Sequence, residues 1–544
     1  MALEQACEEL YAFGQSTTIS HPAVADVVGN KGANLMRMAE AGLPVPPGFI
    51  LPTQLCRDCL QSGGQVPEGT RELLQRGIRQ VEQWSGLSFG GDRRPLLVAV
   101  RSGSPASMPG MMDTILNVGL CDRTLPALIR MTGNPRHAWD SCRRLIQAYA
   151  EVVCRLEPDP FDRILDDYLQ RECVPTVSEL DVAALKRLVR DFLDHFQTSF
   201  GEPFPQDPMA QLFGAVQAVF RSWQSTRAVA YRQLHGLDSL IGTAVTVQTM
   251  VFGNMGSTSG SGVGFTRNPA TGENGLYLDF LSNAQGEDVV SGRCPVQDVV
   301  GLQQRLPELH GQLRRIQERL EFLFRDAQDF EFTVQEGRLY LLQTRNAKRT
   351  AWAALRIACE QVTEELIDPA AALSRLAEYD LNSIQQVRVI TTEGCRPIGK
   401  GIAASPGVAV GKAVFDPNRA VRMAEAGGSA ILIRTDSSTA DIAGLAASAG
   451  VVTTRGGRTS HAAVVARQLN KVCIVGCREL AVSDDCRSGR IGDHVIEDGA
   501  TVSLDGNSGL VYAGSLEVII ERPTAYLQEV DRWKADVSSA ADGG

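Results

Sequence analysis

Short apolar runs punctuated by glycine and proline dominate the first 120 residues. Two of these runs, LPVPPGFIL at 43–51 and LLVAVRSGS at 96–104, have the length and composition of buried strands. From about 122 to 235 the apolar positions recur at helical spacing instead, as in AALKRLVRDFLDHFQTSF. The pattern therefore predicts strands with intervening helices, followed by a helical insertion at 122–235.

Strand character returns after the helical insertion, in TAVTVQTMVFG, GVGFTRNP and NGLYLDFL, and it ends in DFEFTVQEGRLYLLQTR at 329–345. We expect this last run to be a hairpin that turns at Glu336 and Gly337. The next stretch, 351–400, begins as a helix and then lacks a long apolar face, which is typical of a linker between domains.

Beyond residue 401 short strands alternate with glycine-rich turns around one clear helix, HAAVVARQLN. This pattern predicts a compact domain at 401–521 and a tail at 522–544, in which the run WKADVSSAADGG at 533–544 is predicted to be disordered. The elements together predict an α/β (α+β) protein with a first domain at 1–350 and a linker at 351–400 before the second domain.

Composition narrows the class of protein. A chain of 544 residues with 44% hydrophobic and 21% charged residues indicates two to four globular domains. The formal net charge of −10 argues against a nucleic acid partner, because binding to the phosphate backbone needs a basic surface. We expect no membrane span, since no apolar segment reaches about 18 residues. The acidic start MALEQACEEL lacks a secretory signal and favours the cytoplasm.

The cysteines and the standard nucleotide motifs exclude further classes. The thirteen cysteines are scattered singly apart from Cys56 and Cys59, so we interpret the cysteines as reduced thiols. Cys56 and Cys59 have no second pair to complete a zinc site, and we interpret them as a pair on one helix. The closest approach to a Walker A loop, GVAVGKA at 407–413, is one residue short between its glycines and lacks the final Ser or Thr. Dinucleotide-binding and protein-kinase signatures are also absent from the sequence.

Separated charged residues in glycine-rich settings remain as candidates for binding phosphate. Lys31 lies in GNKGANL, a setting also typical of a solvated turn, and Arg101 precedes a Ser/Gly/Pro/Met run that suits either a mobile flap or an ordinary loop. On the predicted hairpin, Asp329 and Glu331 share one strand face, as do Gln343 and Arg345 on its partner. If the strands pair in register, these groups suit Mg²⁺ and ATP; the alternative is an exposed cross-strand salt bridge.

His461 is the second candidate, in TTRGGRTSHAAVVARQLN at 453–470. The two glycines predict a tight loop, Thr459 and Ser460 are favourable helix N-caps, and His461 is predicted at the first turn of the helix. Backbone N–H groups at a helix start stabilise an anionic phosphoryl group, so this placement suits a phosphorylated histidine. The alternative is a histidine with a structural role.

A series of motifs runs in order along residues 20–520: GNKGANL, VRSGSPASMPGMMDTILN, TAVTVQTMVFGNMG, GVGFTRNPATGE, NAQGEDVV, ASPGVAVGK and GGRTSHAAVVAR. In this series the chain resembles the pyruvate phosphate dikinase family. The run MPGMMDTILN is similar to the dikinase that uses inorganic phosphate rather than to phosphoenolpyruvate synthase or rifampin phosphotransferase. The resemblance implies an ATP-grasp nucleotide-binding domain joined to a swivelling β/β/α phosphohistidine domain.

The resemblance also implies roles for individual residues. Those implied for nucleotide binding are Lys31, Arg101, Gly110, Met111, Met112, Glu287, Asp329, Glu331, Gln343 and Arg345. Within this set, the run from Gly110 to Met112 would be the tip of a loop over the phosphates, and Glu287 would lie near the ribose. Glu331 and Gln343 would hold Mg²⁺. The catalytic residues would be Arg101, Arg345 and the carrier His461, and Thr459 would be the target of a regulatory kinase.

The chain differs from the family's usual sequence at two positions, and it is also shorter than the family's members. Arg458 stands where the family usually has Met, and Asp279 stands where Glu is expected. The family continues into a C-terminal barrel of roughly 250 residues that binds pyruvate or phosphoenolpyruvate. We expect that barrel on a separate chain, because residues 522–544 are too few to build it.

The resemblance thus implies a transferase of pyruvate metabolism that converts ATP, inorganic phosphate and His461 to AMP, pyrophosphate and phosphohistidine. Two alternatives stay open: a phosphotransferase with a different small-molecule or protein acceptor, and a non-catalytic ATP-binding regulatory module. A homo-oligomer is compatible with each. We also expect rigid-body rotation about the segment 346–400, because one histidine must meet both ATP and a distant acceptor.

Overall fold

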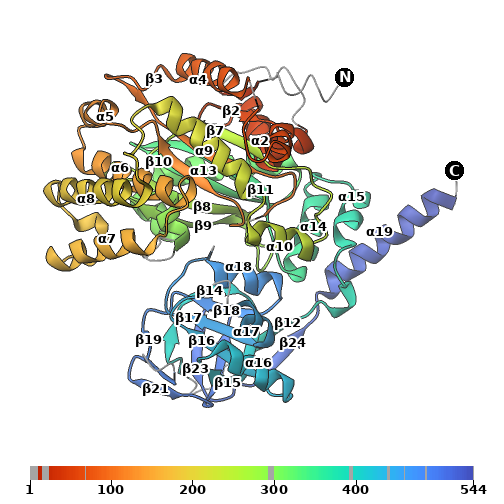
Figure 1. The fold of residues 1–544 in the computed structure, drawn as a ribbon. Helices are drawn as coiled ribbons and strands as arrows, with labels where there is room; N and C mark the ends of the chain where they lie inside the picture. The colour runs from red at the N-terminus through yellow and green to blue at the C-terminus, as the bar shows by residue number, and fades with distance from the viewer. Residues whose placement is uncertain are drawn as a thin grey trace. The chain divides into compact units, whose positions relative to one another are not determined.

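The computed structural model describes residues 10–14, 24–67, 69–108, 110–291, 299–390, 396–437, 441–458, 460–483 and 487–542. The fold is mixed α/β (Figure 1). It divides into two compact units. The first unit comprises Met1–Thr258 and Val334–Thr344, and the second comprises Ser259–Thr333 and Arg345–Gly544. Among the described residues, no helix has both the length and the apolar character needed to cross a bilayer.

An antiparallel five-stranded sheet forms the centre of the first unit. Its strands, in spatial order, are β1 (Tyr11–Phe13), β2 (Gly48–Leu51), β7 (Ala244–Thr249), β5 (Val98–Gly103) and β6 (Thr114–Val118). The apolar runs at 43–51 and 96–104 therefore supply β2 and β5, as predicted. Residues such as Phe49, Ile50 and Val100 are fully buried, because both faces of this sheet are covered by helices.

Helices account for the rest of the first unit. Before β5 along the chain come α2 (Ala25–Glu40), α3 (Thr53–Gln61) and α4 (Thr70–Ser85), followed by the short strands β3 (Ser88–Phe89) and β4 (Pro95–Leu96). Between β6 and β7 come α5 (Thr124–Thr132), α6 (Pro135–Val152), α7 (Asp159–Arg171), the 3₁₀ turn η1 (Val177–Glu179), α8 (Val182–Phe200), α9 (Pro208–Ser222) and α10 (Thr226–Leu234). These helices occupy the stretch for which the apolar spacing predicts them.

The second unit begins with strands β8 (Gly260–Arg267) and β9 (Asn274–Ser282), which belong to a sheet in the order β11-β10-β8-β9. Strands β10 (Gln328–Gln335) and β11 (Arg338–Asn346) are the predicted hairpin. Its turn at Glu336 and Gly337 is confirmed, since both residues have positive φ, 48° and 79°. Helices α11 (Gly286–Ser291), α12 (Val299–Arg305) and α13 (Pro307–Phe324) lie between β9 and β10.

An eight-stranded sheet dominates the end of the second unit. Its order is β13 (Gly399–Lys400), β23 (Leu510–Ala513), β22 (Thr501–Asp505), β15 (Val408–Val414), β16 (Ala430–Arg434), β17 (Gly450–Thr453), β18 (Val472–Val475) and β14 (Ile402–Ser405). The central strands from β15 to β18 are parallel. Helices α16 (Pro417–Glu425), α17 (Ile442–Ala447) and α18 (His461–Gln468) accompany them, and a small sheet of β19 (Leu480–Val482), β20 (Ser488–Ile491) and β21 (His494–Glu497) follows.

The segment predicted as a linker is largely built into the second unit. It contains α14 (Ala351–Thr363), α15 (Pro369–Leu376), the 3₁₀ turn η2 (Leu381–Ser383) and β12 (Gln386–Val389), and β12 pairs antiparallel with β24 (Val518–Glu521). A small core formed by α14 and α15 explains this order, because Leu355, Ala358 and Leu376 are buried there.

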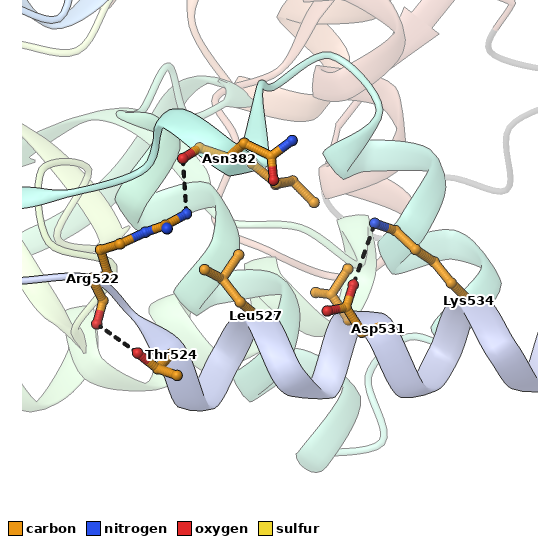
Figure 2. Close-up of a pocket in the computed structure, with 8 residues that line it drawn as sticks. Asn382, Arg522, Thr524, Leu527, Asp531 and Lys534 are labelled. Carbon is orange, nitrogen blue, oxygen red and sulfur yellow. Dashed lines mark hydrogen bonds and ion pairs between the residues drawn. The ribbon is translucent and has the colours of Figure 1, made fainter.

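The prediction of a disordered tail was wrong for most of its length. Residues Thr524–Asp542 form helix α19, which lies beside α14 and α15 (Figure 1). Its apolar side chains Tyr526, Leu527, Val530 and Trp533 recur at helical spacing and join the same core. At its start, a pocket of about 240 Å³ opens between α19 and η2, where Arg522 donates to the Asn382 carbonyl (Figure 2).

Candidate functional site

Lys31 lies in helix α2 and not in a solvated turn. The helix is kinked at Gly29, whose φ of 70° suits glycine, and a Cβ on Gly29 would stand 1.8 Å from the carbonyl oxygen of Gly103. The kink thus lets α2 approach the end of β5, where the Asn30 N–H donates to the carbonyl of Ser104 at 3.0 Å. The Lys31 Cβ lies 3.6 Å from the position of a Cβ on Gly103.

Arg101 stands on β5 two residues before Gly103, on the same strand face. Its guanidinium donates to the carbonyl of Leu342 at 3.1 Å and to Oε1 of Gln343 at 3.4 Å. The first unit therefore brings together two cations and an amide oxygen, Lys31, Arg101 and Gln343, from three elements that are far apart in the sequence. We refer to these three residues as the cationic cluster.

The loop from Gly110 to Met112 is anchored by a residue that the sequence analysis did not single out. Gly110 has a φ of 70°, as a tight turn requires, and Met111 and Met112 pack partly against the core of the first unit. Arg227 on α10 donates to the Met111 carbonyl at 3.2 Å and pairs with Asp113. No local pattern marks Arg227, because it lies more than 100 residues from this loop.

Asp329 and Arg345 lie at the base of the hairpin and both belong to the second unit. They form an ion pair with an Nε–Oδ2 distance of 2.8 Å. The pair does not match the alternative of an exposed salt bridge, because only 9% of the Asp329 side chain and 31% of the Arg345 side chain are exposed. Burial raises the pKa of the Asp329 carboxyl, and the Arg345 guanidinium partly offsets this effect. Half-buried Glu331 adds a second negative charge near both groups.

His461 is the first residue of α18, as predicted, and Ser460 occupies the N-cap position with extended backbone angles. The expected capping bond is absent, however, because the Ser460 side chain accepts from no helix N–H. Three buried side-chain atoms of this segment have no hydrogen-bond partner among the described residues: Nε of Arg458, Oγ of Ser460 and Nε2 of His461. Such atoms are costly to bury, so their clustering points to a missing polar group.

The loop that precedes His461 is tied to strand β9. Asp279, whose side chain is fully buried, accepts from the backbone N–H of Arg458 at 2.7 Å and from its Nη1 at 2.8 Å. The Arg458 guanidinium also lies 4.5 Å from the ring centre of Tyr277. The two positions at which the sequence departs from the family, 279 and 458, are therefore partners in one ion pair.

Arg467 on α18 completes this arrangement and was missed by the sequence analysis. It donates to the carbonyl of Arg458 through Nη2 and to the carbonyl of Ala404 through Nη1, each at 2.9 Å. An arginine near the end of a helix usually faces solvent, so only the tertiary structure marks this one as buried.

Two implied site residues lie partly or wholly outside the described atoms. Glu287 is on α11, but its side chain is not among the described ones, and Thr459 lies outside the described residues. The cysteine pair is a helical pair, as predicted: Cys56 and Cys59 are buried on α3, and burial raises the pKa of the Cys56 thiol to about 12. The described residues contain no group of three or more His, Cys, Asp or Glu placed to hold a metal ion.

The residues implied for Mg²⁺ fit that ion by their chemistry. Glu331 offers a carboxylate and Gln343 an amide oxygen, both hard ligands, and Mg²⁺ commonly takes only one or two protein ligands beside water and substrate phosphates. The Gln343 oxygen already faces a positive group, the Arg101 guanidinium. A small oxygen donor set of this kind suits Mg²⁺ bound together with a nucleotide.

Comparisons with known proteins agree with the motifs. Residues 64–310 match the family model "Pyruvate phosphate dikinase, AMP/ATP-binding domain", and residues 427–509 match "PEP-utilising enzyme, mobile domain". The first match includes Arg101, and the second includes His461 together with Arg458 and Arg467.

Curated relatives carry the name pyruvate, phosphate dikinase. The protein of Clostridium symbiosum is 43% identical over 498 residues, which cover 91% of this chain and 57% of the relative. Those of Rhizobium meliloti and Flaveria pringlei are 41% and 42% identical, covering 97% and 93% of this chain and 60% and 53% of the relatives.

This chain thus spans a little over half the length of these relatives, each of which is a single longer chain. The comparisons give no support to the expected separate barrel chain. Over more than nine tenths of its length the chain is similar to pyruvate, phosphate dikinases, and two of its regions match the models of an AMP/ATP-binding domain and of the mobile domain of PEP-utilising enzymes.

Proposed function

We propose that this protein transfers a phosphoryl group from ATP to His461. The reaction is ATP, inorganic phosphate and His461 going to AMP, pyrophosphate and phosphohistidine. One phosphoryl group of ATP becomes bonded to the imidazole, and another joins inorganic phosphate. The observation that carries the proposal is the start of α18, where His461 Nε2 is buried without a partner beside unpartnered Ser460 and Arg458 atoms. A phosphoryl group would supply the missing acceptor oxygens.

The cationic cluster suits the triphosphate. Lys31 and Arg101 have positive charge beside the end of β5, and an arginine fork matches phosphate oxygens. We assign them to binding the ATP phosphates, with the loop from Gly110 to Met112 covering the same groups. Arg227 anchors that loop through Met111, which would limit the set of positions the loop samples.

The partly buried pair of Asp329 and Arg345 suits the phosphoryl group that is transferred. Arg345 is held by Asp329, so its guanidinium keeps a fixed direction, and a fixed cation stabilises the spread negative charge of a phosphoryl-transfer transition state. Glu331 and Gln343 are assigned to Mg²⁺, which when bound neutralises charge on the phosphates. We assign Glu287 to the ribose and Thr459 to regulatory phosphorylation on the family resemblance alone.

On the same basis we assign an ATP-grasp fold to 1–350, with its helical insertion at about 122–235, and a swivelling phosphohistidine domain to 401–521. The phosphoryl group of His461 would then pass to pyruvate or to another acceptor. The proposal for His461 does not depend on which acceptor follows.

The test is incubation of the chain with Mg²⁺ and ATP labelled at the β-phosphate, with and without inorganic phosphate. We expect acid-labile label on the wild type, loss of label in His461→Ala, and AMP formation that phosphate increases. His494→Ala is the matched control, because His494 is exposed on β21 and should label as the wild type does. ATP binding without label would identify a non-catalytic nucleotide-binding module. Loss of label after addition of pyruvate, with phosphoenolpyruvate formed, would identify the acceptor.

A further inference from the structure

Arg467 is a buried cation without a carboxylate partner among the residues that the structure describes. Only 5% of the residue is exposed. Its two terminal nitrogens donate to the backbone carbonyls of Ala404 and Arg458, and its guanidinium lies 5.8 Å from the ring centre of Phe265. Carbonyl dipoles and a ring face compensate a full positive charge only in part, since taking a charge out of water is expensive.

The surrounding charges do not remove this deficit. The carboxylates that act on Arg467 through space are Asp329 on β10 and Asp279 on β9, and each is already paired with another arginine, Arg345 and Arg458 respectively. Tyr277 and Cys473 act on Arg467 as well, but burial raises the pKa of both, so neither supplies a negative charge near pH 7. Burial lowers the pKa of Arg467, as expected for a cation short of negative partners. The positive charge of Arg467 is therefore not fully compensated, and one more anion close to it would be stabilised.

The position of Arg467 relates that charge to His461. The two residues are six positions apart on α18, and long side chains on a helix point back towards its N-terminus. The guanidinium accordingly reaches the carbonyl of Arg458, three residues before His461. The backbone of Arg458 is thus held at two points: its N–H donates to Asp279, and its carbonyl accepts from Arg467.

A second, independent observation concerns the same segment. The Ser460 side chain is on a residue only 6% exposed, and its hydroxyl has no partner. Nε of Arg458 and Nε2 of His461 are buried without partners as well. Burying a polar atom without a partner is unfavourable, because the atom loses its hydrogen bonds to water. Two donors and a histidine nitrogen within four residues are the groups that an anion attached to His461 would use.

We propose that Arg467 is a positioning residue for phosphohistidine: it holds the loop that precedes His461, and its charge is balanced when His461 carries a phosphoryl group. The inference rests on the proposed function. A phosphoryl group on imidazole is an anion with three acceptor oxygens, so it meets both the charge deficit at Arg467 and the unpaired donors at Arg458 and Ser460.

The test uses two routes to phosphohistidine in the full chain. In one, Mg²⁺ and labelled ATP supply the phosphoryl group. In the other, phosphoramidate transfers its phosphoryl group to the imidazole as its P–N bond breaks and ammonia leaves, so no catalysis by the protein is required. The variants are Arg467→Met, which keeps the length but not the charge, and Arg467→Lys, which keeps the charge but only one donor group. Arg422→Met on α16 is the control, because the Arg422 side chain is 65% exposed.

We expect Arg467→Met to shorten the half-life of phosphohistidine at position 461 at least fivefold, whichever reagent formed it, and to slow labelling by saturating ATP at least tenfold with ATP affinity unchanged. Arg467→Lys should lie between Arg467→Met and the wild type in both measurements. Thermal unfolding of each variant is followed in parallel, and a residue with only a structural role would lower the unfolding temperature without changing the half-life in the folded protein.

The outcomes distinguish a failure of the role inferred for Arg467 from a failure of the proposed function. If folded Arg467→Met, or folded Arg467→Lys where the Met variant does not fold, keeps the wild-type half-life and labelling rate, the inference is wrong. If neither reagent labels His461 in the wild type, the segment does not take a phosphoryl group and the inference fails as well. If phosphoramidate labels His461 and ATP does not, the proposed function fails, whereas the inference is still decided by the half-lives.

Discussion

The ion pair between Arg458 and Asp279 offers a direct measure of how firmly the His461 loop is held. Asp279 accepts two hydrogen bonds from Arg458, one from its backbone and one from its guanidinium. The change Asp279→Asn preserves the shape of the side chain and one acceptor oxygen. It removes the negative charge and replaces the other oxygen by an amide donor, which then faces a donor of Arg458.

The expected cost follows from the geometry of the pair. A hydrogen bond to a charged group contributes about 1.5–3 kcal/mol, and breaking a fully buried ion pair costs about 3–5 kcal/mol. The Arg458 side chain keeps 16% exposure and lies over Tyr277, so water and the ring relieve part of the uncompensated charge. We therefore expect a cost of about 2 kcal/mol, which corresponds to roughly a 30-fold change in an equilibrium constant.

Native-state hydrogen exchange measures this change where it acts. In Asp279→Asn, amides of α18 should exchange about 30-fold faster through local opening of the loop, while amides of β15 keep their wild-type rates. Glu521→Gln is the control, because its pair with Arg388 is exposed, at 41% and 55%, and contributes about 0–1 kcal/mol. Unchanged exchange in α18 of Asp279→Asn would refute the view that this pair holds the loop.

Three further predictions concern stability and reactivity. Arg267 is fully buried and pairs with Glu321, Glu360 and Glu364, so Arg267→Met should lower the free energy of unfolding in urea by about 3–5 kcal/mol. The control Arg187→Met removes an exposed ion pair with Glu172 and should cost less than about 1 kcal/mol. Equal losses in the two variants would contradict the view that burial makes the Arg267 network important for stability. Burial lowers the pKa of His137 to about 4, below its ordinary value of 6.5, so the unfolded chain binds more protons between these values and stability falls as pH drops from 6.5 to 4. In His137→Leu, the loss of unfolding free energy between pH 7 and pH 4 should be smaller than in the wild type by about 3 kcal/mol. The same loss in both proteins would exclude His137 as the cause of this pH dependence. Among the described cysteines, exposed Cys173 should be alkylated by iodoacetamide first and buried Cys56 only on unfolding, as peptide mapping would show; early labelling of Cys56 would contradict its burial.

Local patterns in the sequence were sufficient for most individual elements. Alternating and continuous apolar runs gave β2 and β5, and the Glu336-Gly337 pair marked the hairpin turn, because backbone conformation there depends on neighbouring residues alone. His461 was likewise predicted at the start of α18, and Ser460 does occupy the N-cap position, although its side chain makes no capping bond. Helix α19 was not predicted, because its apolar face is short and the helix is stabilised mainly by packing against α14 and α15.

Only the tertiary structure determined which charged groups meet. Arg101 contacts Gln343 across 242 residues, and Arg458 contacts Asp279 across 179 residues. Neither pairing has a local signature, because contact between distant residues depends on strand order and on how loops return to the sheet. Burial has the same origin: nothing near Arg467 in the sequence shows that its charge lies in the interior. The sequence alone thus determined which chemical groups are present and the elements that carry them, whereas packing between distant elements decided their partners and their electrostatic surroundings.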